Sequence, residues 1–111
     1  MKWKAAVASS DGKVINQHFG RAKEFLIFEI TGQDFQFLEL RQNIPTCGLG
    51  EHHEDAMTKT VELLSDCRVV LVSQIGPGAV EALRRKGVQV FAVPVFIEEA
   101  LHKITASQKF L

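Results

Sequence analysis

Long apolar runs are missing from this sequence. No stretch approaches the roughly 20 residues that a membrane-spanning helix requires, and the short apolar run after the first residues lacks a signal cleavage site. An excess of charge is missing too: 13 Lys and Arg balance 13 Asp and Glu, so no net field favours nucleic acid or an anionic membrane. We therefore expect a cytoplasmic protein with neither partner.

Cysteine is scarce, with only Cys47 and Cys67 present. Without a secretory signal, two thiols in a reducing compartment are expected rather than a disulfide. Two cysteines are too few to hold an iron–sulfur cluster permanently, and together with the histidines they match no standard zinc spacing. Repeats, linkers and low-complexity segments are also absent, so we expect a single domain over residues 1–111.

What is present is an alternation of β-type and helical patterns in the order β-β-β-α-β-α-β-α. Met57 and the phenylalanines fit core positions, and His102 falls on the solvent side of the last predicted helix. The predicted strands cover Ala5 to Ala8, Glu24 to Thr31, Phe35 to Arg41, Arg68 to Ser73 and Val88 to Val93, and the predicted helices cover about Glu54 to Ser65, Pro77 to Lys86 and Ile97 to Ser107.

These elements predict a mixed α/β sheet. A hairpin places the second strand antiparallel between the first and third, and right-handed crossovers make the later strands parallel to the first, which gives the order 3-2-1-4-5. Three connections then open at one edge of the sheet: Ser9 to Arg21, Gln42 to His53, and Gly76 to Gly78. The winding reverses between the first and fourth strands, where open α/β sheets usually bind ligands.

Candidate ligands lie in these loops. His18 can bind a metal or titrate near neutrality, although a loop histidine bonded to nearby backbone is an equally good interpretation. Cys47 stands in a polar loop although free cysteines prefer burial, which favours a ligand or reactive thiol. Only one of the adjacent His52 and His53 can face a common ligand. Cys67 is expected at the opposite edge, in a structural role.

Positive potential is expected at the same edge. The predicted helices that begin near His53 and Gly78 direct unpaired backbone amides toward it, which favours an anionic ligand. Lys13, Arg21 and Lys23 add positive charge, although surface lysines are more often simply solvated. Gly76 to Gly78 lacks the Lys-Ser/Thr of a P-loop and is expected to be a turn.

The segment from Val7 to Gly12, together with Asn16 to Ile27 and its His18-Phe19-Gly20 motif, resembles the dinitrogenase iron-molybdenum cofactor biosynthesis family. This family includes NifX-type carriers and the C-terminal domain of NifB. Ile75 to Ala79, with Gly87-Val88, extends the resemblance over nearly the whole chain. The resemblance implies a ribonuclease-H-like three-layer α/β/α fold with the sheet order given above.

The resemblance also implies a function: a non-catalytic carrier that transiently binds the iron-molybdenum cofactor or its Fe-S precursor. Its partners would be nitrogenase cofactor-assembly proteins, and the chain would be a monomer or a weak homodimer. His18 and Cys47 are the expected metal ligands, and His52 or His53 and Arg21 are expected to assist in binding the cofactor. The three-cysteine radical SAM motif of full-length NifB is absent, so the chain cannot perform that chemistry.

Two other functions compete with the carrier. The implied fold suggests a nuclease, but two-metal phosphodiester chemistry needs several carboxylates on adjacent strand ends. Asp11 is well placed, whereas the fourth strand offers Val70, Val72 and Ser73. The second alternative is a regulatory or scaffolding module outside nitrogen fixation, which binds a simple metal such as zinc or a protein partner.

Overall fold

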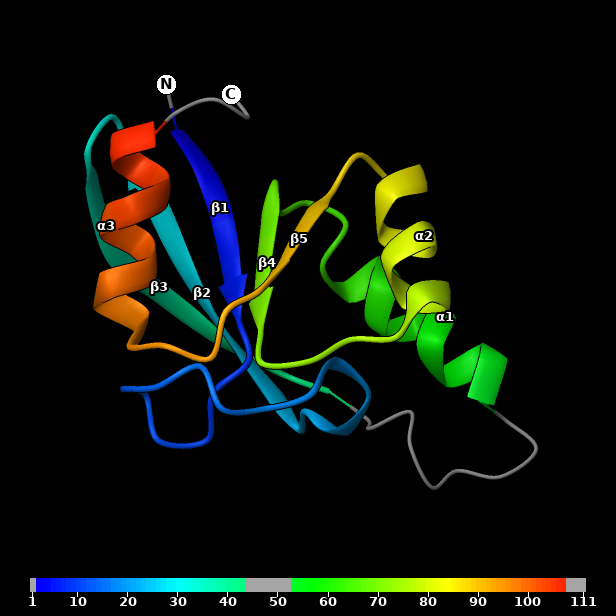
Figure 1. Cartoon of the computed structure of the whole chain (residues 1–111). Coiled ribbons are helices and arrows are strands. Elements are labelled where there is room, and N and C mark those ends of the chain that lie inside the picture. Colours follow the sequence, from blue (N-terminus) through cyan, green and yellow to red (C-terminus); the bar gives the residue numbers. More distant parts are fainter. Residues whose placement is uncertain (1, 44–52, 108–111) are drawn as a thin grey trace.

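The computed structural model describes residues 2–43 and 53–107. Its elements alternate as the sequence patterns predict, and Figure 1 shows them in a layered arrangement. In chain order they are β1 (Lys2–Val7), the short 3-10 turn η1 (Phe19–Arg21), β2 (Glu24–Thr31), β3 (Asp34–Gln42), α1 (His53–Leu63), β4 (Val69–Val72), α2 (Pro77–Arg85), β5 (Gln89–Ala92) and α3 (Ile97–Ser107).

The sheet has the order β3-β2-β1-β4-β5, which confirms the predicted topology. β1 pairs antiparallel with β2, with Val7 opposite Leu26, and β2 pairs antiparallel with β3. On its other side β1 runs parallel to β4, with Val7 opposite Leu71, and β4 runs parallel to β5. β1 and β4 therefore end at the same edge, and the winding reverses between them.

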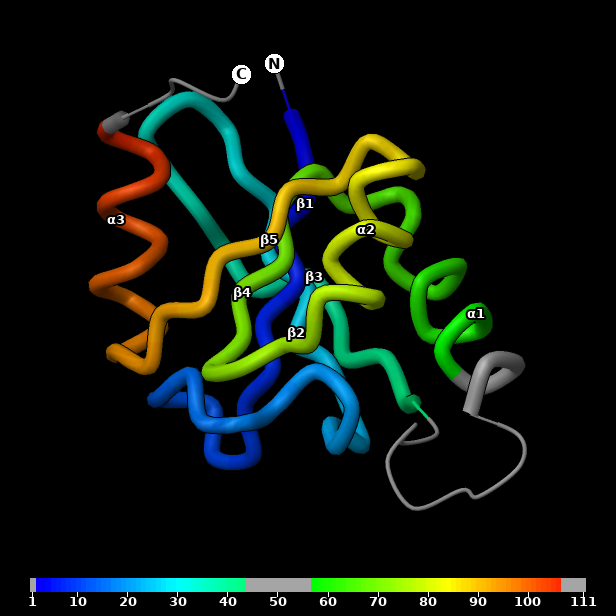
Figure 2. Tube along the Cα trace, turned by 45° about the vertical axis from the view of Figure 1, so that its right-hand side comes forward, coloured from blue at the N-terminus to red at the C-terminus, as the bar shows by residue number. Residues whose placement is uncertain are grey.

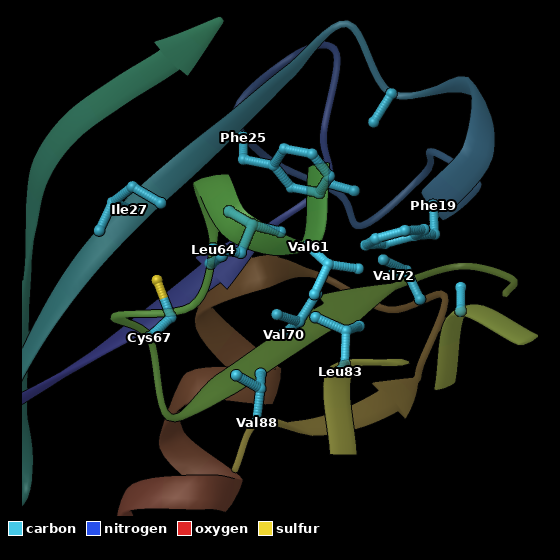
Figure 3. Close-up of a cluster of buried hydrophobic side chains, with 14 residues drawn as sticks. Phe19, Phe25, Ile27, Val61, Leu64, Cys67, Val70, Val72, Leu83 and Val88 are labelled. Atoms are coloured by element: carbon cyan, nitrogen blue, oxygen red, sulfur yellow. The ribbon is translucent and has the colours of Figure 1, made fainter. Parts of the chain in front are cut away.

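Helices cover both faces of the sheet: α1 and α2 lie on one side and α3 lies on the other (Figure 1). β1 faces both layers, because Ala6 packs on the α1/α2 side, as does Ala8 just after the strand, and Ala5 and Val7 pack on the α3 side. The core on the α1/α2 side (Figure 3) contains Ala6, Ala8, Phe19, Ala22, Phe25, Ile27, Val61, Leu64, Cys67, Val70, Val72, Ala79, Leu83 and Val88.

The first strand begins earlier than predicted, at Lys2 rather than Ala5. The lysines on either side of Trp3 obscure the alternation of buried and exposed residues in this part of the strand. Trp3 itself is only 7% exposed and lies opposite Ile30 of β2. Lys4 carries its charge out of the core to Asp66, 3.1 Å away. The other predicted ends differ by a few residues at most, as is usual at helix and strand termini.

β3 is an edge strand, as the predicted order of the sheet requires, and most of its residues are exposed. Phe37, Leu38 and Leu40 are 56%, 41% and 42% exposed. The register of β3 against β2 shifts between Ile27 and Phe28, a β-bulge that interrupts the regular edge. Among the described residues, no helix is long and apolar enough to span a bilayer.

Candidate functional site

The loop between β1 and β2 is ordered by hydrogen bonds of its own polar side chains. The Asp11 carboxylate accepts hydrogen bonds from the Ser9 hydroxyl at 3.1 Å and from the backbone N–H groups of Lys13 at 2.9 Å and Val14 at 3.1 Å. These bonds, led by the one from Lys13, lower the pKa of Asp11. Asn16 also holds the loop: its side-chain oxygen accepts a hydrogen bond from the backbone N–H of Ser10, and its side-chain amide donates one to the Ser10 hydroxyl, each at 3.0 Å.

The far end of this loop docks onto the chain just after β4. Ser73 donates its backbone N–H to the carbonyl of Gln17 at 3.0 Å, and Phe19 donates its own to the carbonyl of Gln74 at 2.9 Å. The Phe19 side chain is buried against Phe25, with ring centroids 6.0 Å apart (Figure 3). His18 is thus held between two backbone anchors while its side chain remains exposed.

His18 borders a pocket of about 370 Å³ at the edge of the sheet where β1 and β4 end. In Figure 2 the blue loop that carries His18 runs alongside the yellow-green connection from β4 to α2. Segments from the β1–β2 loop, α1, the end of β4 and the start of α2 contribute to the wall. The described lining residues are His18, Phe19, Gly20, Met57, Gln74, Ile75, Gly76, Gly78 and Ala79.

The N-terminus of α2 forms another part of the pocket wall. Gly76 is the N-cap and provides no side-chain cap, and the first turn contains no acidic residue. Pro77 occupies the beginning of the helix, where its missing N–H costs nothing. The uncapped amides and the helix dipole favour a negatively charged group at this end. A side chain at Gly76 or Gly78 would meet nothing within 4 Å, so the wall is open there.

Residues 1–107 match the family described as "Dinitrogenase iron-molybdenum cofactor". The chain belongs to this family. "FeMo cofactor biosynthesis protein NifB" from Frankia alni is 38% identical over 104 residues, which cover 91% of this chain and 20% of that protein. "Protein NifX" from Azotobacter vinelandii is 32% identical over 96 residues, which cover 81% of this chain and 56% of that protein.

A solved structure shows the same fold at lower identity. The apo form of the orange protein from Desulfovibrio gigas superposes with a TM-score of 0.72 at 19% identity, over 96% of this chain and 89% of that one. The chain spans about a fifth of the length of the NifB relative and just over half of the length of NifX.

The structure describes only some of the residues that the sequence predicts for the binding site. His18 lines the pocket, whereas Arg21 is exposed at the end of η1 and is not among the described lining residues. Cys47 and His52 lie outside the described residues. His53 begins α1, but its side chain also lies outside the described part. The roles of Cys47, His52 and His53 stay predictions from the sequence.

Lys13 and Lys23, expected to add positive charge beside His18, contribute to hollows other than the His18 pocket. Lys23 lines a polar hollow with Ser9 and Gln17, and Lys13 lines an apolar one between the loop and α3. None of the described residues that line the His18 pocket is Lys or Arg, so the described lining feature that favours an anion is the amino end of α2.

Two lining residues were missed by reasoning from sequence. Met57 fits the apolar periodicity of α1, and it does pack against the core, but it is only partly buried and also lines the pocket. Gln74 is exposed and pairs with His18 in an isolated parallel bridge. A signal for Met57 was available, since it stands in the first half of a helix that was predicted to start at the same edge of the sheet as the His18 loop.

The alternative of a nuclease depends on a cluster of carboxylates near Asp11. The Asp11 carboxylate is occupied in holding its own loop, as described above. Among the described side chains, those of residues 2–43 and 57–106, no three His, Cys, Asp or Glu gather closely enough to hold a metal ion. A two-metal site requires such a cluster.

Cys67 lies away from the pocket, as predicted. It precedes β4, whereas the His18 loop docks at the other end of that strand, and Figure 3 shows Cys67 and Phe19 at opposite ends of the core. Cys67 is 3% exposed, and burial raises the pKa of its thiol to about 12, with the nearby Asp66 carboxylate adding to the rise. A buried, protonated thiol of this kind is unreactive.

Proposed function

We propose that this chain is a non-catalytic carrier that binds the iron-molybdenum cofactor or its Fe-S precursor beside His18 and passes it on. The observation that carries the proposal is that an exposed imidazole and an uncapped helix N-terminus border one pocket. Imidazole is a good ligand for iron, and helix amides favour an anion. Together they suit an anionic metal cluster that arrives preassembled.

The small number of donors supports reversible holding. His18 is the one described imidazole at the pocket, and no carboxylate is among the described lining residues. A cluster with few protein bonds can leave again, whereas permanent clusters are held by a full set of thiolates. From the sequence, Cys47 remains our proposed second metal ligand, and His52 or His53 and Arg21 remain proposed cofactor contacts.

Family membership supports the biological setting. NifB and NifX are relatives, and NifB is named as an FeMo cofactor biosynthesis protein. We extend the proposal accordingly: residues 1–111 form one carrier domain that works in the cytoplasm and exchanges its cargo with nitrogenase cofactor-assembly proteins.

Anaerobic titration of the chain with isolated iron-molybdenum cofactor, followed by visible absorption, tests the proposal. We expect stoichiometric binding by the unmodified chain and at least about tenfold weaker binding by His18→Ala. His102→Ala is the matched control, because His102 is an exposed histidine on α3, across the sheet from the α1 and α2 layer. Equal binding by all three proteins would reject His18 as part of the site.

A second variant tests the pocket itself. A leucine at Gly78 would extend into the open space described above, and the backbone there needs no left-handed conformation. We expect Gly78→Leu to fold normally and to bind the cofactor more weakly by obstructing the pocket. Binding unchanged from that of the unmodified chain would show that the cluster sits elsewhere.

A further inference from the structure

Met57 gives the pocket a second soft donor. It lies on α1, one turn after the helix begins, and is the one sulfur-containing residue among the described lining residues. Its side chain packs against the α1/α2-side core but is not fully buried. A thioether therefore borders the same space as the imidazole of His18.

The remaining lining residues narrow the choice of ligand. They offer the amide of Gln74, apolar surface and backbone, and no described lining residue is Asp or Glu. Hard cations such as Mg²⁺ and Ca²⁺ require several oxygen ligands and depend on carboxylates. Thioether and imidazole donors instead suit soft or borderline metals and metal–sulfur clusters.

We infer that the Met57 thioether contacts the metal–sulfur cargo directly and, with His18, makes the pocket select such clusters over hard cations. The inference rests on the proposed carrier function and names a specificity-determining residue for it. A thioether is neutral and binds more weakly than a thiolate, so it stabilises the bound cluster without preventing its release. The competing explanation is that Met57 only fills space, as methionine often does in cores.

Substitution by leucine separates the two explanations. Met57→Leu keeps an apolar side chain of similar volume, which cores usually tolerate, but removes the sulfur. We expect its affinity for isolated iron-molybdenum cofactor to fall by about five- to tenfold with an unchanged thermal midpoint. Leu63→Met is the control, because Leu63 is a partly buried residue of the same helix that is not among the described lining residues, and the affinity of this variant should not change.

NMR of protein labelled at the methionine methyl carbons provides a readout independent of affinity. The sequence has two methionines, Met1 and Met57, so Met1 supplies an internal reference and Met57→Leu assigns the signals. On addition of the cofactor, we expect a strong paramagnetic shift or broadening of the Met57 methyl signal and little change at Met1. Mn²⁺ at the same concentration, a harder paramagnetic cation, should leave the Met57 signal unchanged.

The outcomes separate this inference from the function on which it depends. If the unmodified chain binds cofactor, but Met57→Leu binds equally well and the Met57 methyl signal does not respond, the inference is wrong and the carrier stands. Broadening of the Met57 signal by Mn²⁺ would overturn the claimed selectivity. If the unmodified chain binds no cofactor, the carrier proposal fails, and this inference fails with it.

Discussion

Replacing Arg41 by methionine should destabilise the protein far more than the same change at a typical surface arginine. Arg41 stands near the end of β3, and its side chain is only 15% exposed. Its Nη1 donates to the carbonyl oxygen of Leu63 at 2.8 Å, where α1 ends. Nη1 and Nη2 also hold both carboxylate oxygens of Asp66 at 2.7 and 2.8 Å, and Nε donates to Glu39 at 2.8 Å.

The magnitude follows from which of these bonds are shielded from water. A hydrogen bond from a charged donor contributes about 1.5 to 3 kcal/mol, which applies to the shielded bond with Leu63. Asp66 and Glu39 are 46% and 47% exposed, so solvent screening reduces each of these ion pairs to about 0 to 1 kcal/mol. We therefore expect Arg41→Met to lower the free energy of unfolding by about 1.5 to 5 kcal/mol.

Urea unfolding at neutral pH, followed by circular dichroism, measures the change. For a chain of this size the loss corresponds to a thermal midpoint lower by about 10 °C. Arg84→Met is the matched control: Arg84 is 74% exposed and reaches only Glu81, at 3.8 Å, so we expect a loss below about 0.5 kcal/mol. Equal losses in the two variants would refute the claim that Arg41 fastens β3 to the end of α1.

Other predictions concern pH, reactivity, backbone and the anchor of the loop. Arg41 lowers the pKa of Asp66 below its ordinary 3.8, so wild type should exceed Arg41→Met in free energy of unfolding by the full amount above about pH 4 and by less at lower pH. A difference that stays constant down to pH 2 would contradict this. Cys67, with its raised pKa, should resist iodoacetamide at pH 8 in the folded chain and react after unfolding, as peptide mass mapping would show. Gly87 has φ +80°, so Gly87→Ala should cost about 1 to 2 kcal/mol in urea unfolding, and an unchanged midpoint would exclude that backbone strain. Phe19→Ala should cost about 3 to 5 kcal/mol, because Phe19 is 2% exposed, and should weaken cofactor binding by freeing His18; tight binding by a destabilised variant would show that His18 needs no such anchor.

The predicted topology was correct because the hydrophobic pattern and chirality rules leave few alternatives. The tight Thr31–Asp34 connection requires a hairpin, and the connections through α1 and α2 are long enough for the right-handed crossovers that join parallel strands. Helix α3 begins at Ile97, as predicted, and is helical through Ser107. The first strand was predicted too short, because lysines on both sides of Trp3 obscured its alternation.

The β1–β2 loop was less well understood from sequence. The sequence predicted a loop that carries a candidate ligand, but Ile15 and Phe19 within it are buried, one on each side of the sheet. The bond from Ile15 N–H to the carbonyl of Val95 and that from Phe19 N–H to Gln74 join the loop to distant connections. No local pattern records such pairings, because each requires that the whole sheet be assembled.

By itself, the sequence determined the order and direction of the strands, the edge at which the loops meet, and His18 as a candidate ligand, since these follow from local periodicity and chain connectivity. Only the tertiary structure decided what shares a pocket with His18. Met57, Gln74 and the amino end of α2 come from separate parts of the chain. Their common position depends on how α1 and α2 pack on the sheet. That packing is determined by the shapes of the side chains in contact, and hydrophobic periodicity does not specify those shapes.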